Sequence, residues 1–361
     1  MKSRFETALL AGLLVLASLS GCVSVELNTN TAYLALGDFI TDGATLSNPT
    51  DEAYPTLVSR QKNAPLRNLA NAGDQACDVP ARQIFPNSIS PTLVSHPTYS
   101  VLIGVNDVDN QGQGAYEQVF IACHQAMLAW LALPKEGKIL AGAAGFEARG
   151  PGKIDATNGW NAWTTQGQGS TISFTIATAK GGPIYAWPLI DDSSAATYGY
   201  ALDGVEAGTA AVQTTPRIAT QNGTTRSLGF LRWPWVPAGT HTVTFIQTNA
   251  GASGVSVVGI GAPSAVPAGQ LPAVLSGTVP YQLHTGQNVG CQATDAPCLA
   301  YNDDILADVN MFAGDGLNVL LFDTRQYLQG TSAEMSDAVH PNAKGQEMLS
   351  DAVQAAWPRE K

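Results

Sequence analysis

Basic residues are scarce in this sequence: 18 Lys and Arg stand against 29 Asp and Glu in 361 residues, which gives a formal charge of −11. The N-terminal leader described below carries Lys2, Arg4 and Glu6, a net +1, so the rest of the chain stands at −12. Proteins that bind nucleic acid rely on Lys and Arg to neutralise phosphates. We therefore expect no nucleic-acid partner.

Long apolar runs are also rare. The run from Ala8 to Leu19, preceded by Lys2 and Arg4, is shorter than the roughly 20 residues that span a bilayer but suits the core of a signal peptide. No other stretch reaches membrane-spanning length. We predict that residues 1–22 are a targeting segment.

The leader closes with Leu19-Ser20-Gly21-Cys22, which resembles a bacterial lipobox. The resemblance implies acyl chains on Cys22 that anchor an exported lipoprotein to a membrane. Val23 after the cysteine implies the outer membrane if the cell is Gram-negative. The alternative is an ordinary secretory signal in which Cys22 is coincidental.

Only five cysteines are present, and four remain after Cys22. An even number in an exported chain favours disulfides over free thiols. Three pairings are open, and the short separation of Cys291 from Cys298 favours that bridge together with Cys77–Cys123. A metal site is the rival, but neither a C-x-x-C pair nor His at ligand spacing accompanies the cysteines, so we expect no metal.

What the sequence does have is 45% hydrophobic residues, 36 Gly and 21 Pro, over a length that suggests two cores. Residues 32–144 and 264–361 alternate apolar strands with helical patterns, which favours a parallel sheet covered on both faces. Strands are expected at 32–36, 100–105, 138–143 and 318–323, and helices at 116–133, from a cap at Asn302 or Asp303, and at 342–357.

Between residues 145 and 263 the chain is rich in Gly and Thr and lacks a helical period. Strands are expected at 171–177, 183–191, 198–202 and 241–248, with a hairpin turn at Asp203-Gly204. We predict an antiparallel β-sandwich inserted into the α/β domain.

Four short segments at strand ends or before the last helix together resemble the SGNH/GDSL hydrolases: Gly37-Asp38-Phe39-Ile40-Thr41-Asp42-Gly43, Asn71-Ala72-Gly73, Gly104-Val105-Asn106-Asp107 and Asp337-Ala338-Val339-His340-Pro341. The similarity covers residues 32–143 and roughly 264–358. It implies a three-layer α/β/α, flavodoxin-like fold with an esterase site at the carboxyl edge of the sheet.

The resemblance also implies the roles of individual residues. His340 would be the general base and Asp337 would orient it. The Gly73 N–H and the Asn106 amide would form the oxyanion hole. The implied reaction is hydrolysis of acetyl or short acyl esters on a glycan or lipid-like substrate, through an acyl-enzyme and without metal or organic cofactor.

The sequence departs from the family at the nucleophile. The family places serine directly after Gly-Asp, where this chain has Phe39. A phenyl ring has neither a proton to surrender nor a lone pair with which to attack, so covalent catalysis cannot occur there. Thr41 as a substitute nucleophile, and activation of water by Asp42 or His340, are the alternatives. We expect hydrolysis to be absent or severely weakened.

The insertion holds a second clue, since five of the seven tryptophans lie in it: Trp160, Trp163, Trp187, Trp233 and Trp235. Tyr185, Tyr198 and Tyr200 lie nearby, and the module resembles carbohydrate-binding β-sandwiches. These rings either stack on sugars or fill the core of the sandwich. Trp233-Pro234-Trp235 is the best candidate for an exposed platform. A non-catalytic glycan-binding lipoprotein is therefore the alternative function.

Overall fold

The computed structural model describes residues 32–92, 97–111, 115–192, 194–206, 212–214, 218, 220–250, 254–267, 271–283 and 291–358. The expected leader 1–22, with Cys22, lies outside these ranges. Within them, no helix has the length and apolarity needed to cross a membrane.

A parallel sheet of five strands organises the α/β part of the chain. Its order is β18-β17-β3-β1-β2. The strands are β1 (Tyr33–Gly37), β2 (Leu66–Asn68), β3 (Thr98–Leu102), β17 (Ala273–Gly277) and β18 (Val319–Phe322). Every residue of β1, β3 and β17 is buried. Burial along a whole strand is what a sheet covered on both faces requires, and it explains why these segments are mainly apolar.

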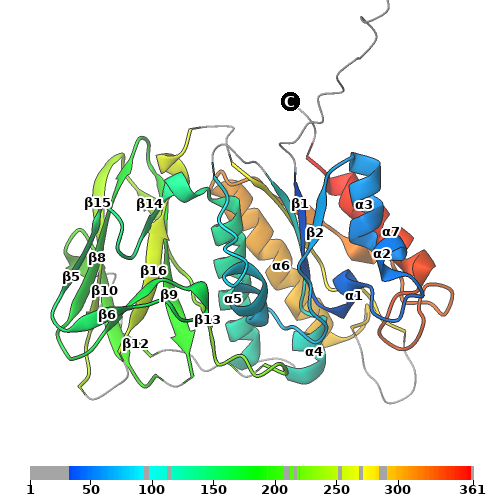
Figure 1. Ribbon diagram of the computed structural model, residues 1–361, viewed down its shortest axis with the longest axis horizontal. Coiled ribbons are helices and arrows are strands. Elements are labelled where there is room, and N and C mark those ends of the chain that lie inside the picture. The colour runs from blue at the N-terminus through cyan, green and yellow to red at the C-terminus, as the bar shows by residue number, and fades with distance from the viewer. Residues whose placement is uncertain are drawn as a thin grey trace, which may run out of the picture. The chain divides into compact units, whose positions relative to one another are not determined.

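Helices cover both faces of this sheet. Figure 1 shows α5 (Ala115–Ala132) and α6 (Ala296–Gly314) on one face and α3 (Tyr54–Lys62) and α7 (Ala343–Ala356) on the other. The α6 helix begins at Ala296 rather than at the expected Asn302 or Asp303, because Pro297 suits the first turn of a helix. The shorter helical elements are α1 (Phe39–Asp42), α2 (Pro49–Glu52), α4 (Val105–Gln111), the π-helical turn η1 (Val79–Ile84) and the 3₁₀ turns η2 (Lys135–Gly137), η3 (Thr157–Gly159), η4 (Pro263–Ala265) and η5 (Thr324–Gln326).

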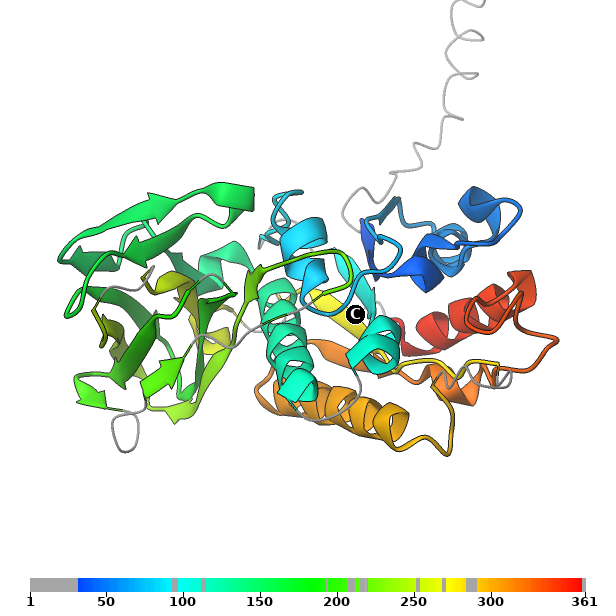
Figure 2. The same ribbon diagram turned by 90° about the horizontal axis from the view of Figure 1, so that it is seen from below.

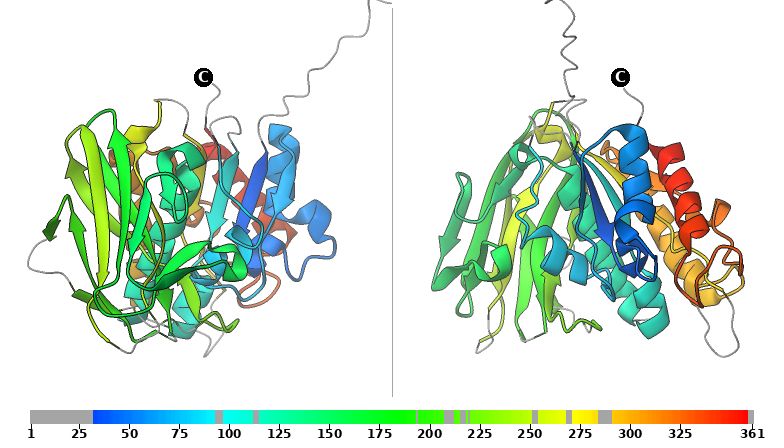
Figure 3. Two further views of the ribbon diagram at one scale, coloured as in Figure 1. Left: turned by 60° about the vertical axis from the view of Figure 1, so that its left-hand side comes forward. Right: turned by 45° about the vertical axis from the view of Figure 1, so that its right-hand side comes forward.

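Residues 138–261 form two antiparallel sheets, which begin before the boundary expected at residue 145. One has the order β11-β10-β15-β8-β5 with β12 on β10, and the other the order β13-β9-β16-β7-β6 with β14 and β4 at its sides. The strands are β4 (Lys138–Leu140), β5 (Phe146–Arg149), β6 (Gly152–Asp155), β7 (Ala162–Thr165), β8 (Thr171–Thr178), β9 (Gly182–Asp191), β10 (Thr197–Leu202), β11 (Val205–Glu206), β12 (Val212–Thr214), β13 (Arg226–Leu228), β14 (Leu231–Val236), β15 (Gly239–Gln247) and β16 (Ser256–Gly261). Apolar side chains of both sheets, among them Ile172, Phe174 and Val257, form a core of their own. Figure 3 shows the two sheets facing each other.

One expected strand has an unexpected partner. Lys138–Leu140 forms a strand, but it pairs antiparallel with β16 rather than with the parallel sheet. The expected hairpin at Asp203-Gly204 is present, with both residues in the left-handed region at φ 52° and 76°. That conformation is the one that a two-residue hairpin turn requires.

The sandwich packs directly on α5. Trp187 of β9 meets Trp130 of α5 edge to face, with ring centroids 5.3 Å apart, and its indole Nε1 donates to the Ala126 carbonyl at 3.2 Å. Figure 2 shows α5 between the strands of the sandwich and the rest of the α/β domain. The two cores are therefore joined through this helix.

Both expected disulfides are present. Cys77 is bonded to Cys123, and Cys291 to Cys298. The first bridge ties the loop after β2 to α5, and the second closes the start of α6 onto the segment that precedes it.

Candidate functional site

The turn between β1 and α1 places Phe39 at the carboxyl edge of the sheet. Gly37 ends β1 where a Cβ atom would lie 2.4 Å from the Leu102 carbonyl oxygen, so only glycine fits. Asp38 caps α1 by accepting a hydrogen bond from the Ile40 N–H at 2.9 Å. Phe39 is then the first residue of the helix and is 8% exposed.

The loop before α7 holds a histidine–aspartate pair. His340 Nδ1 lies 2.9 and 2.8 Å from the two carboxylate oxygens of Asp337. Burial would raise the pKa of Asp337, but hydrogen bonds from the backbone N–H groups of Val339 and His340 and from the His340 ring outweigh it and lower that pKa. The carboxylate therefore fixes the imidazole and leaves Nε2 as the nitrogen that can serve a nucleophile.

Phe39 lies against this histidine. The centroids of the phenyl and imidazole rings are 4.6 Å apart. Gln346 of α7, the helix that follows the loop of His340, bonds to the helices around Phe39: its Nε2 donates to the Ile40 carbonyl of α1 at 2.9 Å, and its Oε1 accepts from the Tyr54 N–H of α3 at 2.8 Å. The residue that follows Gly37-Asp38 is thus beside the imidazole, and it is a hydrocarbon ring.

The alternative groups near Phe39 are poorly placed to replace a nucleophile. Thr41 is fully buried, and its hydroxyl lies 3.2 Å from the Tyr54 hydroxyl. Asp42 is exposed at the end of α1. Neither side chain has a hydrogen bond to His340 among those of the described residues.

The two residues expected in the oxyanion hole belong to loops that are bonded to each other. Gly73 sits at φ +79°, a conformation that favours glycine. Asn106, at the start of α4, donates from its side-chain amide to the Asp74 carbonyl at 2.9 Å. Asn71 N–H in turn donates to the Gly37 carbonyl at 3.2 Å. The loop 71–74 is therefore held against the ends of both β1 and β3.

Three buried carboxyl groups lie under these loops: Asp38, Asp74 and Asp107. Burial raises the pKa of each, and to about 7 for Asp107, which accepts from the Ala76 N–H at 3.0 Å. The charges of Asp74 and Asp107 raise the pKa of Asp38 further. Asp38 and Asp107 accept from backbone N–H groups, and Asp74 accepts from the side chains of Gln83 and Asn222, so all three support the loops of the site.

The insertion also reaches this site, which the sequence did not reveal. Asn222 donates to the Ala72 carbonyl at 3.2 Å and to the Asp74 carboxylate at 2.7 Å. The Gln221 N–H donates to the Gln75 side chain at 2.7 Å. Segment 220–224 thus holds the loop around Gly73 from the side of the sandwich.

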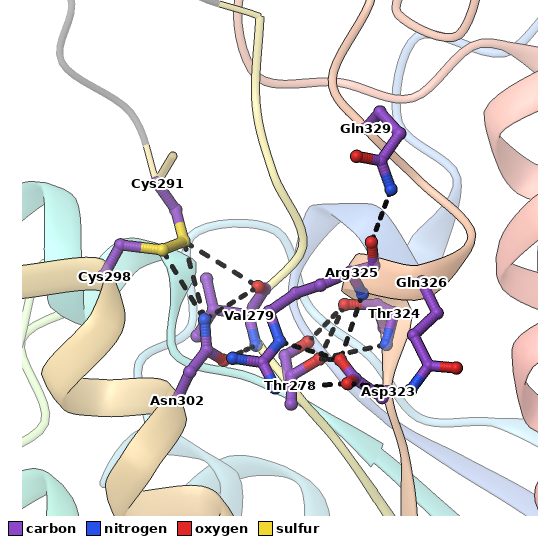
Figure 4. Close-up of polar contacts among 10 residues, drawn as sticks. All are labelled: Thr278, Val279, Cys291, Cys298, Asn302, Asp323, Thr324, Arg325, Gln326 and Gln329. Carbon is purple, nitrogen blue, oxygen red and sulfur yellow. Dashed lines mark hydrogen bonds and ion pairs between the residues drawn. A yellow bond between two sulfur atoms is a disulfide. The ribbon is translucent and has the colours of Figure 1, made fainter. Parts of the chain in front are cut away.

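The neighbouring strand ends are fixed by a second polar network, drawn in Figure 4. The Asp323 carboxylate after β18 accepts from Arg325 Nε at 2.7 Å and from the Thr278 hydroxyl at 3.1 Å. Asn302 of α6, beside the Cys291–Cys298 bridge, accepts from the Val279 N–H at 2.7 Å. The segment that follows carries Leu283, whose N–H donates to the Ala338 carbonyl and so supports the loop of His340.

A Ser-His-Asp arrangement, not anticipated from the sequence, lies inside the α/β domain. His124 Nδ1 is 2.7 Å from Asp308 Oδ2, and its Nε2 is 3.1 Å from the Ser276 hydroxyl. The three residues come from α5, α6 and β17, and all are buried. We call them the buried triad. Its hydrogen bonds are those of a catalytic triad, but no substrate has access to the serine, so its role is structural.

Most of the aromatic residues of the insertion fill cores. Trp160, Trp187 and Tyr185 are at most 1% exposed, and Tyr198 is buried as well. Trp233 is 9% exposed and meets Tyr200 edge to face, whereas Trp235 is 70% exposed. Of the two tryptophans expected to form an exposed platform for sugars, only Trp235 is exposed.

Among the described residues, no group of three or more His, Cys, Asp or Glu side chains is arranged to hold a metal ion.

No protein-family model and no curated protein matches the chain. Solved structures do match it. The crystal structure of a two-domain esterase (CEX) active on acetylated mannans, co-crystallized with mannopentaose, covers 70% of this chain and 93% of its own, with 11% identity and a TM-score of 0.36.

Family 35 carbohydrate-binding modules match a smaller part of the chain. One from an environmental isolate covers 38% of this chain and 97% of its own, with 18% identity and a TM-score of 0.28. Another, from Cellvibrio japonicus Abf62, covers 34% and 90%, with 18% identity and a TM-score of 0.27. At these values the residues of the site, rather than the similarities, have to decide the function.

Proposed function

We propose that the chain is an SGNH-type ester hydrolase, directed at acyl groups on glycans, in which Phe39 has replaced the nucleophile and blocks hydrolysis. The observation that carries the proposal is the phenyl ring of Phe39 packed at 4.6 Å on an imidazole that Asp337 holds in the orientation of a general base. Gly73 and Asn106 lie on mutually bonded loops at the same sheet edge. The histidine–aspartate pair beside Phe39 and the two loops of the expected oxyanion hole support the proposal, since acyl transfer needs a general base and oxyanion donors besides a nucleophile.

The test is hydrolysis of an aryl acetate and of acetylated polysaccharides by the chain lacking residues 1–22. Wild type should show no turnover that depends on His340. Phe39→Ser should gain turnover, by about 10³-fold or more over wild type, because a hydroxyl replaces the ring beside His340. Phe39→Ser with His340→Ala should lose that gain.

Two outcomes contradict the proposal. One is turnover by wild type that His340→Ala abolishes, which would mean that another nucleophile acts. The other is a Phe39→Ser variant that unfolds cooperatively like wild type, yet is inactive towards every ester.

A second candidate function is glycan binding without catalysis. It is favoured by Trp235, whose indole is 70% exposed on a chain in which the other described large aromatic groups are mostly buried. Both functions direct the protein to a glycan, so they are compatible in one molecule.

We also propose that the protein is exported and carries acyl chains on Cys22. Two disulfides in the folded part suit an oxidising compartment. Cells fed an alkyne-labelled fatty acid should incorporate it into wild type and not into Cys22→Ala, with Cys22→Ala released from the membrane fraction. Equal labelling of both proteins would contradict lipidation at this residue.

A further inference from the structure

A pocket of about 360 Å³ lies at the junction of the sandwich and the α/β domain. Its walls come from the turn between β8 and β9, the end of β14, η4 and the end of α6. Leu271 and Gly316, which line it, precede β17 and β18 in the sequence. The pocket is therefore at the amino edge of these parallel strands, whereas His340 and Phe39 belong to the carboxyl edge. It is a different place from the candidate hydrolase site.

Trp235 forms one wall of the pocket. The strand β14 shifts register against β9 between Trp233 and Val236, and this bulge turns Trp235 outward while Trp233 stays in the core. The indole lies on Gly181, where a Cβ atom would come within 2.4 Å of the ring. A glycine at this position thus lets the ring lie close on the turn, so that it is held in place before any ligand binds.

Polar groups accompany the indole. Ser264 lines the pocket, is 3% exposed, and its hydroxyl has no hydrogen-bond partner in the described part of the chain. Lys180, on an exposed turn, also lines the pocket and brings a positive charge to its rim. Asp315, which also lines it, is neutralised by Arg232 at 2.5 Å and accepts from the Tyr185 hydroxyl at 2.7 Å. The groups left to serve a ligand are a hydroxyl, an ammonium and a flat aromatic face.

This combination suits a sugar. A pyranose has an apolar C–H face that stacks on an indole and a rim of hydroxyl groups that need hydrogen-bond partners. The remaining walls are built largely from glycine, which has no side chain to fill the volume, and proline, whose ring restricts the backbone. The volume lies within the range of about 300–1,000 Å³ that small-molecule sites occupy.

We propose that this Trp235 pocket binds a pyranose unit of a polysaccharide, stacked on the indole and hydrogen-bonded by Ser264 and Lys180. The inference deepens the proposed glycan-directed function and rests on it. The pocket would hold the polysaccharide at one edge of the sheet while the ester-bearing unit meets the other.

The test is titration calorimetry and affinity electrophoresis of the chain from residue 23 onward with mannan, xylan, cellulose and galactan fragments. At least one fragment should bind wild type, and Trp235→Ala should weaken that binding about tenfold or more. Gly181→Ala keeps the indole but displaces it, so it should also weaken binding. Ser264→Ala and Lys180→Ala should each cost a few-fold, and Ile154→Ala, an exposed apolar residue of the same sandwich, should cost nothing.

The inference is overturned if no fragment binds wild type, or if binding survives both Trp235→Ala and Gly181→Ala. The result is separable from the proposed hydrolase site, because an aryl acetate needs no glycan contact. If Phe39→Ser gains hydrolysis while glycan binding survives both Trp235→Ala and Gly181→Ala, the pocket proposal alone is refuted. Glycan binding lost on Trp235→Ala, with an inactive Phe39→Ser, would refute the hydrolase proposal alone.

Discussion

Two histidine–aspartate pairs in this molecule have the same hydrogen bond and opposite surroundings. His340–Asp337 is at the surface, with side chains 23% and 48% exposed, and its imidazole faces a phenyl ring. His124–Asp308 is inside, with side chains 1% and 4% exposed, and its imidazole faces a serine hydroxyl. The surface pair can be reached from solvent but has no nucleophile beside it. The buried pair has a serine beside it but cannot be reached by a substrate. Triad geometry therefore identifies a catalytic site only together with access for a substrate.

Removing each histidine in turn should have very different effects on the free energy of unfolding. His124→Ala takes the imidazole from the buried Asp308 and leaves Gln125 Nε2, 2.6 Å from Oδ1, as its neutral partner, so it should lower the free energy of unfolding by about 3 kcal/mol. His340→Ala removes an exposed pair and should cost about 1 kcal/mol or less. Urea unfolding of both variants checks this, and equal losses would show that the buried triad has no special structural role.

A smaller effect separates two carboxyl groups of the open site. Burial raises the pKa of Asp107 to about 7, against about 3.9 in an unfolded chain. Between these values the folded state holds more protons, so the stability from this group is full below about pH 4 and is lost as the pH rises through about 7. The pKa of Asp337 is instead lowered, so its contribution is present above about pH 4 and is lost as the pH falls.

Asp107→Asn should therefore flatten the fall in stability between about pH 4 and 7, by at most about 1.4 kcal/mol per pH unit. Asp337→Asn should leave that fall unchanged and serves as the control. Thermal unfolding across this range checks both variants. An unaltered slope in Asp107→Asn would mean that Asp107 titrates as an ordinary exposed carboxyl group.

Much of the fold followed from local pattern. The strands expected at 171–177, 183–191, 198–202 and 241–248 agree with β8, β9, β10 and β15 to within a few residues, and the final helix begins after Asn342 as expected. Alternation of apolar residues, turn residues and caps are all properties of neighbouring residues, and they are visible in one sequence. The short Cys291–Cys298 separation likewise favoured the pairing that the structure has.

Features that depend on residues far apart in the chain could not be predicted from the sequence. Lys138–Leu140 has the composition of a strand in either sheet, and only the fold decides that it pairs with β16. The buried triad joins residues 152 and 184 positions apart, with no motif around His124. Trp233 and Trp235 differ in exposure because of a bulge, which the pattern Trp-Pro-Trp does not encode by itself.

The candidate site itself was found only through four short motifs. Their loops share one edge because β1, β2, β3 and β18, the strands that precede them, belong to one parallel sheet, whose carboxyl ends lie on the same side. The contacts that hold these loops were missed, above all those of Asn222 from the insertion and of Gln346 from α7. They involve polar residues without any local signature.

The most direct test of the comparison is labelling with a fluorophosphonate, in which a serine oxygen displaces fluoride from phosphorus, followed by intact-mass measurement and peptide mapping. We predict that wild type gains no phosphonyl group although it contains Ser276, that Phe39→Ser gains one at the substituted position, and that Phe39→Ser with His340→Ala gains none. Labelling of wild type at Ser276, or of Phe39→Ser independently of His340, would contradict the account.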